Sequence, residues 1–175
     1  MRYPLSFGLG LISLLGVAFQ AVGAEPPPTF KVGEFTFTRP ASWEWVPVTS
    51  PMRKAQLKVT DKKGSAEVVF SYFGEGNAGG IKANVDRWLG QFQDSSNSKV
   101  EEKTVGTKKV TYVQVEGTYL SGIPGGPKTP QANTMLQGAI AESKQGSVFI
   151  KMTGPVATVR EAKDDFRKLV EGALR

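Results

Sequence analysis

Apolar and polar residues alternate along much of this chain, which is the pattern of half-buried β-strands. The first alternating run, Phe35-Thr36-Phe37-Thr38, stops at Pro40. Two longer runs, residues 54–60 and 66–73, flank the turn residues Asp61-Lys62-Lys63-Gly64. Two such runs around a short turn predict an antiparallel hairpin with a loop of about four residues.

The apolar period changes to that of a helix in two places. Within residues 81–93 the apolar side chains fall on one helical face, at Ile81, Val85, Trp88, Leu89 and Phe92. Near the C-terminus, Thr158 and Glu161 have the T-x-x-E spacing of a capping box, which predicts a helix start. The apolar stripe of this closing helix comprises Val159, Ala162, Phe166, Leu169, Val170 and Ala173.

Strand patterns return between the two helical segments. Four β-like runs are visible there, over residues 99–106, 108–119, 134–142 and 147–153. Turn signals at Gly106-Thr107 and at Ser143-Lys144-Gln145-Gly146 separate the runs of each pair. Strands joined by short turns pair antiparallel, and amphipathic helices need sheet faces to cover. The chain therefore predicts one α+β domain over residues 30–175, a largely antiparallel β-sheet flanked by helices.

The N-terminus has the pattern of an export signal over residues 1–24. Arg2 gives a positive start, residues 5–19 form an apolar run, and small residues lead up to Ala24. The run is shorter than the roughly 20 residues that a spanning helix needs, and no cysteine follows it for a lipoprotein anchor. We expect cleavage near Ala24, a Pro-rich lead-in over residues 25–29, no transmembrane segment in the mature form, and a periplasmic or extracellular location.

The composition excludes much of the common catalytic chemistry, because the 175 residues include no histidine and no cysteine. Ser-His-Asp and Cys-His nucleophiles, His-containing zinc sites, disulfides and thiolate redox centres all need one of these side chains. We therefore predict no catalytic residue, no cofactor-binding residue and no metal ligand. An enzyme that uses carboxylates or a lysine is the alternative that this composition leaves open.

The net positive charge of the chain does little to identify a binding partner. The 22 basic and 16 acidic residues give a formal net charge of +6, and loss of Arg2 with the signal leaves +5. The basic residues come in ones and twos along the chain, as in Arg53-Lys54 and Lys108-Lys109, which is typical of a solvated surface. We expect no nucleic-acid partner, and we keep an anion-binding protein of the cell envelope as a further alternative.

Two segments resemble PsbP-type domains. The aromatic strand that runs into Pro40-Ala41-Ser42-Trp43 resembles their start, and Phe149-Ile150-Lys151-Met152-Thr153-Gly154-Pro155, followed by a helix with Phe166, resembles their close. PsbP is the extrinsic protein of the photosynthetic oxygen-evolving complex, and a Ran-interacting nuclear import factor is similar in fold. The resemblance implies an α/β/α sandwich, with Trp43 as a core or edge anchor and Lys151 as an outward strand residue.

The resemblance leaves function open. Nothing in the chain matches a photosystem-docking segment, and exported bacterial proteins of unassigned role show the same general likeness. It therefore bears on the fold and carries no activity over to this chain.

A glycine motif precedes the first predicted helix. Residues 74–79 satisfy G-x-G-x-x-G between a predicted strand and a predicted helix, as dinucleotide-binding turns do. However, the strand before it is the second arm of a hairpin, and Asp94, the acid at the usual distance, is expected at the end of the helix. We interpret the motif as a turn whose amides are at most a candidate anion site.

A second glycine- and proline-rich segment, residues 121–130, lies between two predicted strands and is longer than most connections. Long, stiff loops commonly carry binding residues, although a loop that wraps a sheet edge is an equal alternative. We predict an exported, non-catalytic binding or scaffolding domain with an unknown protein or envelope component as partner. The candidate surface combines this loop with the Pro40–Trp45 segment, at Trp43, Trp45, Tyr119, Ile123, Pro124 and Lys128.

Overall fold

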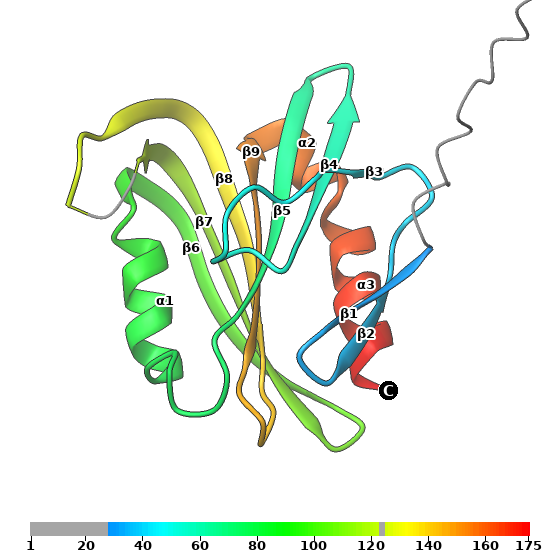
Figure 1. Ribbon diagram of the computed structural model, residues 1–175. Helices are drawn as coiled ribbons and strands as arrows, with labels where there is room; N and C mark the ends of the chain where they lie inside the picture. Colours follow the sequence, from blue (N-terminus) through cyan, green and yellow to red (C-terminus); the bar gives the residue numbers. More distant parts are fainter. Residues whose placement is uncertain (1–27, 123–124) are drawn as a thin grey trace, which may run out of the picture.

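A seven-stranded antiparallel sheet forms the centre of the protein (Figure 1). The computed structural model describes residues 28–122 and 125–175, so the predicted signal and most of the lead-in lie outside the described residues. Across the sheet the order is β3 (Glu44–Trp45), β4 (Ala55–Asp61), β5 (Gly64–Tyr72), β9 (Val148–Pro155), β8 (Thr129–Ala141), β7 (Lys108–Ser121) and β6 (Phe92–Val105). The remaining elements are β1 (Thr29–Val32) and β2 (Phe35–Thr38), which form a separate two-stranded sheet, and the helices α1 (Ile81–Leu89), α2 (Val156–Glu161) and α3 (Lys163–Leu174).

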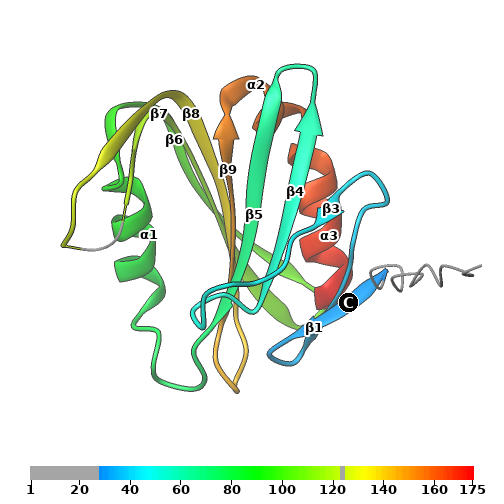
Figure 2. The same cartoon turned by 45° about the horizontal axis from the view of Figure 1, so that its top comes forward.

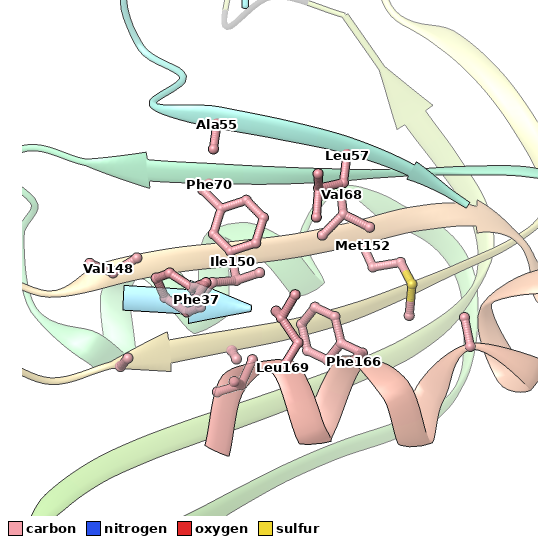
Figure 3. Close-up of a cluster of buried hydrophobic side chains, with 14 of the residues drawn as sticks. Phe37, Ala55, Leu57, Val68, Phe70, Val148, Ile150, Met152, Phe166 and Leu169 are labelled. Atoms are coloured by element: carbon pink, nitrogen blue, oxygen red, sulfur yellow. The ribbon is translucent and has the colours of Figure 1, made fainter. Parts of the chain in front are cut away.

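One face of the sheet is sealed by α3 and by the β1–β2 sheet. Phe37 of β2 and Phe166 of α3 join Phe70 and Ile150 of the sheet in one apolar cluster (Figure 3). The ring centroids of Phe37 and Phe70 are 5.0 Å apart at an interplanar angle of 65°, the edge-to-face geometry that aromatic pairs prefer. Phe70, Ile150 and Phe166 are fully buried, so this cluster is the larger core of the protein.

The second face carries α1, which lies on the opposite side of the sheet from α3 (Figures 1 and 2). Trp88 and Val85 of α1 pack in a second cluster with Phe149, whose ring centroid is 6.3 Å from that of Trp88. A Cβ atom at position 138 would lie 2.4 Å from the Trp88 ring. The glycine of β8 therefore lets the indole rest directly on the sheet backbone.

The structure confirms the α+β class and the antiparallel pairing. The hairpin around residues 61–64 is β4–β5, the turn at Gly106 joins β6 to β7, and the turn at residues 143–146 joins β8 to β9. The predicted stripe of the closing helix is buried at Phe166, Leu169 and Val170. The main elements follow the predicted order, but the structure adds the short strands β1 and β3. It also begins β6 at Phe92 and β8 at Thr129, earlier than predicted, and divides the closing helix at Ala162 into α2 and α3.

The predicted first helix, over residues 81–93, is too long. The helix ends at Leu89, because Gly90 follows it and glycine is a poor helix former. Phe92 keeps its place in the apolar cluster as the first residue of β6. Asp94, expected at the helix end, lies in β6 with a φ of 49°.

The predicted capping box is also wrong. β9 runs directly into α2 with Pro155 as the N-cap residue, so Thr158 lies inside the helix and no side chain caps its start. The Thr158 hydroxyl donates instead to Asp61 Oδ1 at 2.9 Å, and Glu161 forms an ion pair with Lys63 at 2.9 Å. The side chains of Thr158 and Glu161 thus interact with residues of the β4–β5 hairpin. The local spacing of the two residues gives no indication of these distant partners.

An ion pair fastens α3 to the edge strand β6. The Arg167 guanidinium donates hydrogen bonds of 3.1 and 3.0 Å to the two Glu101 oxygens, and it lies 4.3 Å from the centre of the Tyr112 ring. These hydrogen bonds from Arg167, together with Lys99, lower the pKa of Glu101 to about 2. The charged form of Glu101 is therefore favoured by folding.

Two glycine substitutions test the contact between α1 and the sheet. Gly138→Ala should lower the free energy of unfolding by about 1–3 kcal/mol, because its methyl group collides with the Trp88 ring. Gly172→Ala, in α3 with no atom within 4 Å of its added methyl group, should raise stability by about 0.5–1 kcal/mol. Urea unfolding of both variants measures the difference, and equal effects would contradict the packing described.

The Glu101 pair predicts an acid dependence of stability. Its contribution is present above pH 4.5, the ordinary pKa of glutamate, and is lost as the pH falls toward 2. Glu101→Gln should therefore be less stable than the parent protein at pH 7 and should lose less stability between pH 5 and 2. Glu102→Gln, at the exposed neighbouring position, is the charge-matched control in urea unfolding across this pH range. An acid dependence of Glu101→Gln equal to that of the parent would refute the assignment.

Candidate functional site

One helix is too narrow to cover the second face of the sheet. An α-helix is about 10 Å across, whereas seven strands spaced by about 4.8 Å span about 29 Å. Figures 1 and 2 show α1 beside β6, β7 and β8, away from β4 and β5. The result is an open groove of about 980 Å³ between α1 and the β4–β5 hairpin.

The floor of this groove comes from the neighbouring strands β5 and β9. Glu67 lies opposite Thr153 and Val69 lies opposite Lys151 in the antiparallel register, and all four residues line the groove. They alternate with residues that are buried on the first face, such as Val68. The same period of two therefore seals one face and places polar groups on the other.

Lys151 is the least satisfied charge on this floor. Its Nζ lies 3.3 Å from the Tyr119 hydroxyl and 3.4 Å from Gln91 Oε1, both longer than a normal hydrogen bond from nitrogen. It also lies 5.5 Å from the centre of the Tyr119 ring. Within the described ranges no carboxylate forms an ion pair with Lys151. A half-buried ammonium group thus faces the groove with neutral partners alone.

The remaining charges divide the groove into two ends. At the end near β4, Arg53 forms an ion pair of 2.7 Å with Glu67, and Gln56 donates to the same carboxylate at 2.8 Å. At the end near α1, Arg87 donates to the amide oxygen of Asn84, a neutral partner. The β4 end is therefore electrically balanced, and the α1 end carries an excess of positive charge.

Aromatic side chains lie at the same end as the excess charge. Phe73 and Tyr119 are half-buried and line the groove, and the Phe73 ring centroid is 5.9 Å from that of Phe149. Trp88 and Phe149 also line the groove and are at most 6% exposed. An occupant at this end would meet apolar ring surface and cations together.

Thr153 places a hydroxyl group on the floor of the groove. Thr153 Oγ1 is buried and has no hydrogen-bond partner among the described residues. Most buried polar side-chain atoms in proteins have such a partner. Because Thr153 lines the groove, a rotation about its χ1 angle would offer the hydroxyl to an occupant.

The residues predicted from the sequence are not brought together. Trp43 is 2% exposed in the larger core, and Trp45 packs beside it against Phe30 at a centroid distance of 5.2 Å. Tyr119 lies on the other face of the sheet, in β7, which is separated from β3 by β4, β5, β9 and β8. The Pro40–Trp45 segment and the 121–130 loop are therefore not neighbours.

The predicted loop over residues 121–130 is too long, because Ser121 ends β7 and pairs with Thr129, the first residue of β8. Ser121 and Gly122 line the groove, and Lys128 is exposed within the connection between the two strands. Ile123 and Pro124 lie outside the described residues. Of the predicted residues that the structure describes, Tyr119 is the one that lines the groove.

The glycine motif before α1 forms an irregular turn. Gly74, Gly76 and Gly79 have φ values of 80°, 72° and 73°, which glycine adopts at no steric cost. The strand before them, β5, pairs antiparallel with both of its neighbours, so the parallel βαβ unit of a dinucleotide fold is not formed there. The interpretation of this motif as a turn is confirmed.

The architecture of the chain is similar to that of solved structures. The solution structure of cyanobacterial PsbP from Synechocystis sp. PCC 6803 matches with a TM-score of 0.52 and 10% identity, over 87% of this chain and 95% of that one. This is a PsbP-like fold. A protein of unknown function from Pseudomonas aeruginosa gives a TM-score of 0.49 and 11% identity, over 82% of this chain and 92% of that one. No family model and no curated protein matches the sequence.

The sequence alone does not identify most residues of the groove. It indicates Lys151 only as an outward strand residue and assigns no site role to Arg53, Glu67 or Arg87. The signal that the sequence does hold is the polar face of two strand runs, 66–73 and 147–153, which carry Glu67 and Lys151. Their adjacency depends on the pairing of β5 with β9, which are 75 residues or more apart along the chain.

Two further observations concern the part of the chain that the structure describes. Residues 28–122 and 125–175 contain no group of three or more acidic side chains placed to hold a metal ion. None of the helices in these ranges has the length and apolarity to cross a membrane.

Proposed function

We propose that this protein is an exported, non-catalytic binding domain whose ligand site is the groove over β5 and β9. The observation that carries the proposal is Lys151, a half-buried cation with neutral partners in a groove of about 980 Å³. Small-molecule sites in proteins occupy about 300–1,000 Å³ and combine apolar surface with a few polar groups. The groove has this size and this mixture of side chains.

Of the carboxylate- or lysine-dependent enzymes that the composition leaves open, the lining disfavours those that need a pair of carboxylates. Glycosidases use two carboxyl groups about 5–9 Å apart. The described lining of the groove includes a single carboxylate, Glu67, which Arg53 and Gln56 already engage. The binding proposal thus needs no residue beyond those present in the groove.

A blocking variant tests whether the groove holds a ligand. Ser71 lies on the floor beside Phe149, so Ser71→Trp should fill the space that an occupant needs. Native mass spectrometry of mature protein purified from its own host should show a bound small molecule, and Ser71→Trp should lose it. Thr107→Trp, at the exposed β6–β7 turn, is the control that should retain it. A parent protein without bound molecule, or an occupant that Ser71→Trp retains, would falsify the proposal.

The export part of the proposal rests on the sequence of residues 1–24. Their short positive start, apolar run and small residues before Ala24 fit removal by a signal peptidase. Cleavage there would leave residues 25–175, which include the Pro-rich lead-in, the two cores and the groove.

Intact-mass analysis after expression with the full N-terminus tests this processing. The exported protein should begin at Glu25, and Ala24→Arg should accumulate with its first 24 residues attached, because a large charged side chain does not fit a signal peptidase. Gly23→Ser is the control that should still be processed. A full-length product from the parent sequence would contradict cleavage at this position.

A further inference from the structure

We infer that the occupant of the groove is a small organic anion with an apolar ring or chain, held with its acid group at Lys151. The inference rests on the proposed function and adds the chemical class of the ligand. It follows from three properties of the α1 end of the groove: its charge, its apolar surface and the short distance between them.

The charge of this end favours an anion. Glu67 is already paired with Arg53, so these two side chains cancel at the β4 end. Lys151 and Arg87 have neutral hydrogen-bond partners among the described residues. An acid group placed between them would give Lys151 the charged partner that the protein does not supply. Hydrogen bonds between charged groups are also the stronger ones.

The apolar surface favours a ligand with a ring or chain. Phe73 and Tyr119 present partly exposed ring surface to the groove; Phe73 packs against Phe149, and Tyr119 packs against Phe92. A simple inorganic anion would leave this surface in contact with water. Removing apolar area from water gains about 25 cal/mol per Å². The ring surface thus selects an anion that also carries an apolar part.

The spacing of the two features sets the shape of the ligand. Lys151 follows Phe149 by two positions on the same face of β9, a distance of about 7 Å along a strand. The Tyr119 hydroxyl lies 3.3 Å from Lys151 Nζ, so aromatic surface also borders the cation directly. The acid group and the ring of the occupant should therefore be joined by few bonds.

Two fluorescent probes separate the charge from the ring. 8-Anilinonaphthalene-1-sulfonate and N-phenyl-1-naphthylamine share one ring system, and the first carries a sulfonate that the second lacks. Titration of each probe into the mature protein should give an affinity about ten-fold higher for the sulfonate, as expected for one charged hydrogen bond in a partly exposed site. Equal affinities for the two probes would overturn the inference.

Substitutions at Lys151 assign the effect to one residue. Lys151→Gln should remove most of the ten-fold preference and leave the affinity for the neutral probe within about two-fold, whereas Lys151→Arg should keep the preference. Lys62→Gln, at the exposed β4–β5 turn, removes the same charge away from the groove and should change neither affinity. A Lys151→Gln protein that keeps the sulfonate preference would also overturn the inference. Urea unfolding midpoints show that each variant is folded.

The groove-blocking variant distinguishes this failure from failure of the proposed function. If Ser71→Trp abolishes the binding of both probes while the sulfonate gives no advantage, the groove remains the site and the anion assignment is wrong. If Ser71→Trp leaves both affinities unchanged, the groove is not the site and the proposed function is wrong as well. Ser71→Phe provides the same test with a smaller side chain should the tryptophan prevent folding.

Discussion

The contact between Trp88 and the backbone of Gly138 determines where α1 lies on the sheet. The indole can reach the backbone only because no side chain stands at position 138, where a Cβ would be 2.4 Å from the ring. Phe149 packs against this ring, and Leu136 and Ile140 belong to the same apolar cluster. The contact holds a nine-residue helix against one side of a wide sheet. The rest of that face is left open over β5 and β9, and the groove is the direct consequence.

The two faces of the sheet serve different purposes with the same strands. Val68, Phe70 and Ile150 point to the first face and are fully buried under α3 and the β1–β2 sheet. Their immediate neighbours Val69 and Lys151 point to the groove. A large core on one side supplies the burial that a domain of this size needs to be stable. The floor of the other side is therefore free to carry Lys151, Thr153 and Glu67, which would be costly inside a core.

The sequence predicts the elements because each depends on a local period. Residues 66–73 alternate, and residues 81–89 repeat every three or four positions, so β5 and α1 could be found without tertiary information. Where a tertiary partner decides, local rules fail. Thr158 and Glu161 have the spacing of a capping box, yet Asp61 and Lys63 from a distant turn engage both side chains.

The site was harder to predict than the fold, because it is made by pairing between distant strands. Nothing near Lys151 in the sequence indicates that Tyr119 and Gln91 will border its ammonium group. Trp43 and Trp45 attract attention as aromatic residues, but both contribute to the larger core. The sequence places Tyr119 beside a glycine- and proline-rich segment, and its contact with Lys151 forms only in the folded structure.

A crystal structure of residues 25–175 with bound 8-anilinonaphthalene-1-sulfonate tests the central claim most directly. The account predicts the sulfonate oxygens at about 3 Å from Lys151 Nζ, within the range of a charged hydrogen bond, and the ring system against Phe73. A probe bound at another surface, or one in the groove with its sulfonate turned away from Lys151 toward solvent, would contradict it.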